Sequence, residues 1–154
     1  MKLLTPIILG ILLGILLNGC TGAQPTSQRV LNVGMLLARG GLGDRSFNDS
    51  AYAGLQAAQS QYGIRFETAD FTSEEANLEA LRRFAREEYD LIIGVGFENG
   101  PNIETVAKEF PDRNFAIIDT TVEGDNIAAI VYREQEGDFL MGVLAAMVTQ
   151  SNPD

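Results

Sequence analysis

The sequence contains no histidine and only one cysteine, Cys20, among its 154 residues. The absence of histidine excludes the Ser-His and Cys-His pairs of nucleophilic enzymes, and it removes the commonest ligand of transition metals. A single cysteine cannot form an intrachain disulfide or a zinc cluster. We therefore expect that the protein is not an enzyme and that it holds no metal or other cofactor.

Basic residues are also scarce, because 11 Lys and Arg stand against 21 Asp and Glu, which gives a net charge of −10. Nucleic-acid binding needs a basic surface, so this charge argues against a nucleic-acid partner. Hydrophobic residues make up 45% of the chain, which is enough for a packed core. At about 100–200 residues per domain, the chain corresponds to one domain or to one lobe of a larger protein.

Residues 1–19 have the pattern of a secretory signal peptide. Lys2 precedes a mostly apolar stretch at 3–17, which is shorter than the roughly 20 residues of a membrane span. The sequence LNGC at 17–20 resembles the bacterial lipobox, in which the cysteine receives a diacylglyceryl group and becomes the mature N-terminus. The resemblance implies lipidation of Cys20, with 20–29 as a flexible tether. An uncleaved anchor and an ordinary signal peptide are the alternatives.

The rest of the chain alternates short apolar strands with amphipathic helices. Strands are predicted over 30–37, 64–68, 91–95, 115–118 and 127–131. Helices are predicted from an N-cap at Asn48 to 62, from an N-cap at Ser73 onward, from Pro101 to 110, and over 134–149. This alternation predicts an α/β fold with a mostly parallel sheet and helices on both faces. Ligands of such sheets bind beyond the carboxyl ends of the strands, where the loops 38–48, 96–101 and 119–124 follow.

The glycine-rich loop after the first strand has two interpretations. One is the G-x-G-x-x-G pattern of dinucleotide-binding folds, which would begin at Gly41 and Gly43. Its third glycine would fall on Ser46, and Asp44 would face a pyrophosphate. Both features argue against a nicotinamide cofactor.

The second interpretation is a resemblance to the basic membrane protein family, which the loop and several later segments share. These are bacterial lipoproteins, similar to the purine nucleoside receptor, that serve as substrate-binding components of ABC transporters. The matching segments are GGLGDRSFNDSA at 40–51, GVGF at 94–97, VAKEFPD at 106–112, FAIID at 115–119 and EQEGDFLMGVLAA at 134–146. The resemblance covers residues 30 to about 148. It implies a type I periplasmic-binding-protein fold, in which 30–154 form the N-terminal lobe and the second lobe is missing.

The resemblance also implies which residues contact the ligand. Phe47 would stack on a purine ring, unless it packs on its own helix, and Asp119 would accept two ribose hydroxyls, unless it is a turn residue. Asn48 would bond to sugar or base edges, or cap the following helix instead. The further candidates are Asp44 and Ser46 in the first loop, with Asp44 expected to shape the turn, and Gly96 and Phe97 after the third strand, with Phe97 alternatively in the core.

One position departs from the family pattern. Relatives that bind purine nucleosides usually carry an aspartate nine residues before the stacking phenylalanine, and this chain has Ala38 there. The expected function is that of a monomeric, lipid-anchored extracytoplasmic protein of the cell membrane. It would deliver a small molecule, a purine nucleoside, to an ABC permease and its ATPase. A flavin-like heteroaromatic cargo and a ligand-sensing surface lipoprotein without transport are the alternatives.

Overall fold

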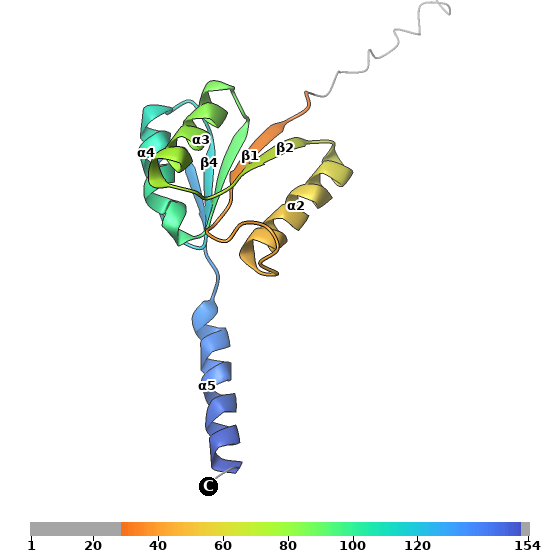
Figure 1. Ribbon diagram of the computed structural model, residues 1–154, viewed down its shortest axis with the longest axis vertical. Helices are drawn as coiled ribbons and strands as arrows, with labels where there is room; N and C mark the ends of the chain where they lie inside the picture. Colours follow the sequence, from red (N-terminus) through yellow and green to blue (C-terminus); the bar gives the residue numbers. More distant parts are fainter. Residues whose placement is uncertain (1–28, 152–154) are drawn as a thin grey trace, which may run out of the picture.

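A computed structural model describes residues 29–151 of the chain. The predicted signal peptide and Cys20, with nearly all of the predicted tether, lie outside these described residues. Five parallel strands form one sheet in the order β2-β1-β3-β4-β5 (Figure 1). The strands are β1 (Asn32–Leu36), β2 (Arg65–Ala69), β3 (Leu91–Val95), β4 (Phe115–Ile118) and β5 (Ile127–Ile130). The predicted α/β fold and each of the predicted strands are therefore confirmed.

The helices follow the strands in the predicted order. They are α2 (Phe47–Tyr62), α3 (Glu74–Arg86), α4 (Gly100–Glu109) and α5 (Glu134–Ser151), with one short 3₁₀ turn, η1 (Phe97–Asn99), before α4. Helix α2 lies on one face of the sheet, while α3 and α4 lie on the other (Figure 1). The hydrophobic core therefore consists of two layers, one on each face of the sheet. One layer lies between the sheet and the pair α3 and α4, around Phe84 and Phe115, and the other lies between the sheet and α2, around Met35 and Leu55.

Three of the four predicted helix starts are confirmed, including that of α5 at Glu134. The hydroxyl of Ser73 accepts a hydrogen bond from the backbone N–H of Ala76 at 3.2 Å, and Pro101 lies in the first turn of α4. The predicted N-cap at Asn48 is wrong, because α2 begins two residues earlier with Ser46 at the N-cap position. The reason is tertiary, since the amide of Asn48 is buried and bonds to the preceding loop rather than to its own helix.

The close approach of α3 to the sheet depends on a glycine in β1. A Cβ atom on Gly34 would lie 2.6 Å from the ring of Phe84, which is itself fully buried. No side chain larger than hydrogen fits there without a shift of the helix. Sequence periodicity does not reveal this constraint, because it depends on how two elements distant in the chain are packed.

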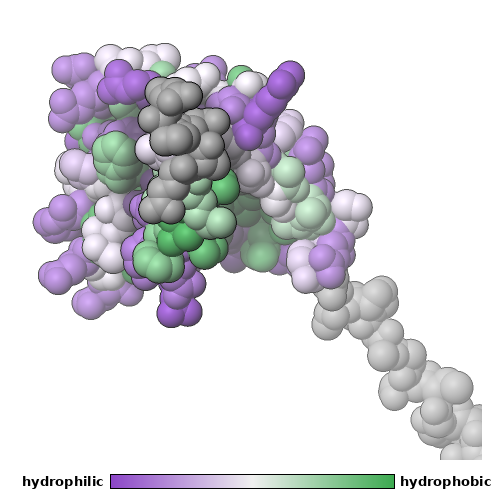
Figure 2. All heavy atoms as spheres, turned by 90° about the horizontal axis from the view of Figure 1, so that it is seen from below, coloured by the Kyte–Doolittle hydropathy of each residue, from purple (hydrophilic) through white to green (hydrophobic). Residues whose placement is uncertain are grey.

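The last helix, α5, extends away from the sheet instead of covering it (Figure 1). All side chains from Val131 to Thr149 are exposed, including the apolar face that the sequence pattern predicts. Seen from below, hydrophobic side chains gather near the middle of the molecule and hydrophilic ones surround them (Figure 2). The exposed apolar residues of α5 are Phe139, Leu140, Met141, Val143, Leu144, Met147 and Val148. None of the described helices is both long and apolar enough to cross a membrane.

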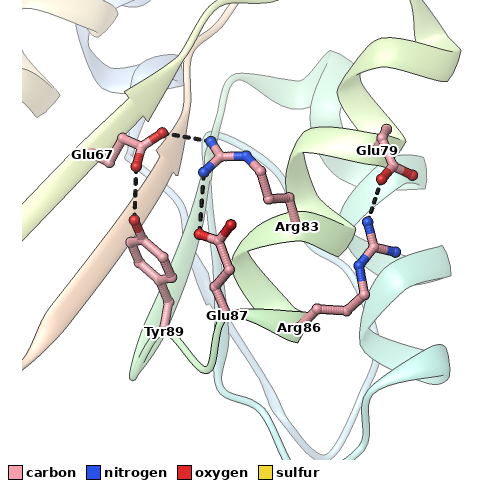
Figure 3. A network of polar contacts seen from close by, with 6 residues as sticks. All are labelled: Glu67, Glu79, Arg83, Arg86, Glu87 and Tyr89. Atoms are coloured by element: carbon pink, nitrogen blue, oxygen red, sulfur yellow. Dashed lines mark hydrogen bonds and ion pairs between the residues drawn. The ribbon is translucent and has the colours of Figure 1, made fainter.

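Ion pairs join α3 to β2 and to its own next turn (Figure 3). Arg83 donates a hydrogen bond to Glu67 at 2.5 Å and pairs with Glu87 at 3.3 Å, while the hydroxyl of Tyr89 donates to the second oxygen of Glu67 at 2.8 Å. The hydrogen bonds from Arg83 and Tyr89 lower the pKa of Glu67 below its ordinary value. Because these groups are largely exposed, each pair contributes at most about 1 kcal/mol to stability.

Candidate functional site

A cavity of about 470 Å³ lies at the carboxyl edge of the sheet, beside the N-terminus of α2. Its volume falls within the range of roughly 300–1,000 Å³ that is typical of small-molecule sites. The residues that line it are Ser46, Phe47, Ser50, Ala51, Ile118, Tyr132 and Glu134. The cavity thus lies where the alternation of strands and helices predicts a ligand, and α2, β4 and the connection from β5 to α5 form its walls.

The loop from β1 to α2 is held in place by one buried amide. Oδ1 of Asn48 accepts a hydrogen bond from the N–H of Ala38 at 2.7 Å, and Nδ2 donates to the carbonyl oxygens of Ala38 at 3.3 Å and Gly41 at 3.0 Å. The side chain of Asn48 is fully buried. It therefore fixes the loop that presents its neighbour Phe47, and it has no exposed surface with which to contact a ligand.

Two carboxylates complete this loop. Asp44 accepts hydrogen bonds from the N–H groups of Ser46 at 2.8 Å, Asn48 at 3.0 Å and Asp49 at 3.1 Å. Although desolvation raises the pKa of Asp44, these N–H donors together lower it below its ordinary value. Asp49 in turn accepts from the N–H groups of Gly43 at 2.7 Å and Arg45 at 2.9 Å. The expectation that Asp44 shapes the turn is confirmed.

Phe47 and Tyr132 form the aromatic side of the cavity. Their ring centroids are 6.4 Å apart, and the ring planes are inclined by 56°. The side chain of Phe47 is 42% exposed and that of Tyr132 is 52% exposed, so both rings present surface to the cavity. Phe47 therefore does not pack on its own helix alone, because its ring also lies near Tyr132 and lines the cavity.

Two carboxyl groups meet beside the same cavity. Asp119 follows the last residue of β4, and Glu134 is the first residue of α5. The hydrogen bond to Asp119, desolvation, and the charges of Asp119 and Asp138 raise the pKa of Glu134 above its ordinary value.

The backbone at Asp119 is strained. Its φ of 79° lies in the left-handed region, which costs a residue other than glycine on the order of 1 kcal/mol. The N–H of Asp119 donates to the carbonyl of Ile130 at 2.8 Å, so its position is fixed from β5. Such strain is concentrated at functional sites. Within residues 29–151, no three acidic side chains converge in a way that could hold a metal ion.

Gly96 and Phe97 lie apart from this cavity. Gly96 has a φ of 85°, a backbone conformation that strains any larger residue, and a Cβ atom there would also lie 2.6 Å from the carboxylate of Glu98 and 3.0 Å from Ala38. Phe97 is 68% exposed, so the alternative that places it in the core is wrong. It lines a separate hollow of about 370 Å³ together with Thr120, Thr121 and Val122, among others.

The structure therefore divides the sequence-predicted candidates. Ser46 and Phe47 line the main cavity. Asp119 does not line it but is a neighbour of Glu134, which does. The sequence analysis missed Tyr132 and Glu134, which follow β5. These two residues obey the same rule that identified the other loops, because β5 is parallel to its neighbour and ends at the same edge.

A family model described as ABC transporter substrate-binding protein PnrA-like matches residues 31–154. The match includes every described element of the fold and every residue that lines the cavity.

The chain is 37% identical over 147 residues to an uncharacterized lipoprotein of Pyrococcus horikoshii, covering 90% of this chain and 36% of that protein. It is 31% identical over 146 residues to the ABC transporter nucleoside-binding protein BmpA of Lactococcus lactis, covering 88% of this chain and 42% of the relative. The chain therefore spans well under half the length of these curated relatives.

Among solved structures, the fold is similar to a solute-binding protein of an ABC transporter system from Aeropyrum pernix K1. The TM-score is 0.72 at 32% sequence identity, and the alignment covers 80% of this chain and 35% of that one.

Proposed function

Because the chain belongs to the family of PnrA-like ABC transporter substrate-binding proteins, we propose that it binds the cargo of such a transporter and that the cargo is a purine nucleoside. The cavity beside Phe47 carries this proposal. Phe47 and Tyr132 offer flat apolar surface there, and Ser46 and Ser50 add hydroxyl groups. Stacking of a base on one aromatic side chain contributes about 1–3 kcal/mol. The name of the Lactococcus lactis relative supports a nucleoside as cargo.

The described residues form one wall of the binding cleft in this proposal. Phe47 and Tyr132 are about half-exposed, so the cavity leaves much of a small ligand open to solvent. The curated relatives are more than twice as long as this chain. We propose that residues 30–154 belong to the N-terminal lobe and that the additional length of the relatives supplies the opposite wall. Binding by this chain alone should therefore be weaker than micromolar.

Ala38 limits what the proposal says about the base. Its side chain is 9% exposed, and its backbone N–H and C=O both bond to the amide of Asn48. The position that carries a base-contacting aspartate in purine-nucleoside-binding relatives thus offers no polar side chain here. Selection among purines has to depend on other residues of the cavity.

The membrane anchor is the second part of the proposal. We propose that Cys20 carries the lipid and that 20–29 tether the lobe at the extracytoplasmic surface, next to a permease and its ATPase. The lipoprotein relative of Pyrococcus horikoshii supports this placement. Cells that express the full chain should incorporate an alkyne-labelled fatty acid into it, and Cys20→Ala should abolish the label. Equal labelling of both proteins would contradict the anchor.

Ligand-observed NMR titration with adenosine, guanosine, inosine and uridine tests the cargo, because it measures weak binding. We expect a purine nucleoside to bind the full chain. Phe47→Ala should weaken this binding about 5- to 150-fold, since it removes the stacking surface. Phe97→Ala is the matched control, because it removes an exposed aromatic ring at the same edge of the sheet but outside the cavity.

The proposal fails if none of the four nucleosides binds, or if Phe47→Ala and Phe97→Ala have equal effects. Riboflavin added to the same chain provides a direct comparison. Quenching of its fluorescence, without nucleoside binding, would assign a flavin-like cargo instead.

A further inference from the structure

Tyr132 has a place in the cavity that the sequence motifs do not assign. It lies in the connection between β5 and α5, far along the chain from Phe47. Both residues nevertheless line the same cavity. The strand β5 is parallel to β4, so its carboxyl end brings Tyr132 to the edge of the sheet where Ile118 ends β4.

The two rings are not arranged as a sandwich. Carbon atoms in contact lie about 3.5–4.0 Å apart, so a flat ligand between two parallel rings needs a separation of roughly 7–8 Å. The ring centroids of Phe47 and Tyr132 are 6.4 Å apart, with their planes inclined by 56°. This arrangement leaves no room for a planar ring between the two side chains, so a ring that stacks on Phe47 can contact Tyr132 only at its edge.

The phenol group gives this edge contact a polar character. A tyrosine hydroxyl both donates and accepts hydrogen bonds, whereas Phe47 offers no polar atom. Tyr132 is 52% exposed and lines the cavity. Its hydroxyl forms no hydrogen bond to another protein group within residues 29–151, in contrast to Tyr89, whose hydroxyl donates to Glu67 at 2.8 Å. The hydroxyl of Tyr132 is thus available to a ligand.

We propose that Tyr132 is a specificity-determining residue that reads the edge of a base stacked on Phe47, by donating a hydrogen bond to a carbonyl oxygen on that edge. This inference rests on the proposed function, because it assumes that the cavity holds a purine nucleoside. It assigns the cargo class more narrowly, as a purine that carries a carbonyl group, such as guanosine or inosine. An unsubstituted purine keeps the stacking surface but has no carbonyl oxygen.

The test compares guanosine with purine riboside by NMR titration of the full chain. The wild-type protein should bind guanosine about fivefold more tightly, the value expected for one neutral hydrogen bond. Tyr132→Phe keeps the ring and removes the hydroxyl, so the preference should fall to about one while purine riboside binds unchanged. Tyr132→Ala should weaken both ligands further. Tyr62→Phe is the matched control, because Tyr62 is 72% exposed at the far end of α2.

The outcomes separate this inference from the function on which it rests. If the wild-type chain binds both nucleosides equally, or if Tyr132→Phe keeps the preference for guanosine, the edge contact is refuted and the nucleoside function stands. If the wild-type chain binds neither nucleoside, the proposed function is refuted together with the inference. Circular dichroism of each variant tests whether the fold is retained, and Tyr132→Phe removes a single oxygen atom.

Discussion

Substitution of Asn48 by alanine tests how the binding loop is held. The variant removes the acceptor of the Ala38 N–H, at 2.7 Å, and the donor to the carbonyl of Gly41, at 3.0 Å. Each such hydrogen bond contributes about 1 kcal/mol, and leaving the buried N–H unpaired costs roughly 1–3 kcal/mol. Alanine recovers about 0.5 kcal/mol of helix propensity. We expect a net loss of about 3 kcal/mol in the free energy of unfolding.

Urea denaturation, followed by circular dichroism, measures this loss. With a slope of about 1.5 kcal/mol per molar urea, the midpoint should fall by roughly 2 M. Gln56→Ala is the matched control, because it makes a similar change at an exposed position of the same helix. Its effect should stay within about 0.5 kcal/mol.

A second variant at the same position tests whether the buried amide has to donate hydrogen bonds to the loop. Asn48→Asp keeps an acceptor for the N–H of Ala38 but turns a carboxylate toward two carbonyl oxygens, so it should also destabilise the fold, and less at pH 4 than at pH 7. The reasoning is refuted if Asn48→Ala unfolds at the midpoint of Gln56→Ala but loses nucleoside binding. That result would mean that Asn48 contacts the ligand directly.

Two further predictions concern stability alone. Gly34→Ala should destabilise the fold by about 1–3 kcal/mol in thermal unfolding, because its Cβ would lie 2.6 Å from the ring of Phe84. Gly54→Ala, an exposed helix position with no atom near the added Cβ, should instead stabilise it by about 0.5–1 kcal/mol, and equal effects of the two would contradict the packing argument. The hydrogen bond from Arg83 keeps the pKa of Glu67 below 4.5, its value in the unfolded chain. The stabilisation that the Glu67 carboxylate provides is therefore fully present above pH 4.5, and it is lost as the pH falls through the lower pKa of the folded state. Glu67→Gln should therefore lower the melting temperature at pH 7 more than at pH 3, and a constant difference between these pH values would refute the assignment.

The candidate site was predictable where a residue's role follows from its place in the chain. Ser46 and Phe47 end the loop that connects β1 to α2, and the rule that ligands bind at the carboxyl edge of a parallel sheet places them at the cavity. The same rule applied to β5 predicts Tyr132. Asn48 could not be assigned in this way, because its sequence neighbours fit a cap and a ligand contact equally well. Only the fold shows that the loop closes over its amide.

The sequence by itself determined the order of the strands and helices and the edge of the sheet at which a ligand binds. These follow from local periodicity, from caps such as Ser73 and from the parallel arrangement that alternating elements require. The tertiary structure decided which aromatic rings share a cavity, since Phe47 and Tyr132 are 85 positions apart and meet only because β1 and β5 end at one edge. It also decided that α5 leaves the lobe with its apolar face exposed. An apolar pattern predicts that a face can be buried, but burial needs a partner surface, and only the tertiary structure shows whether the described residues provide one.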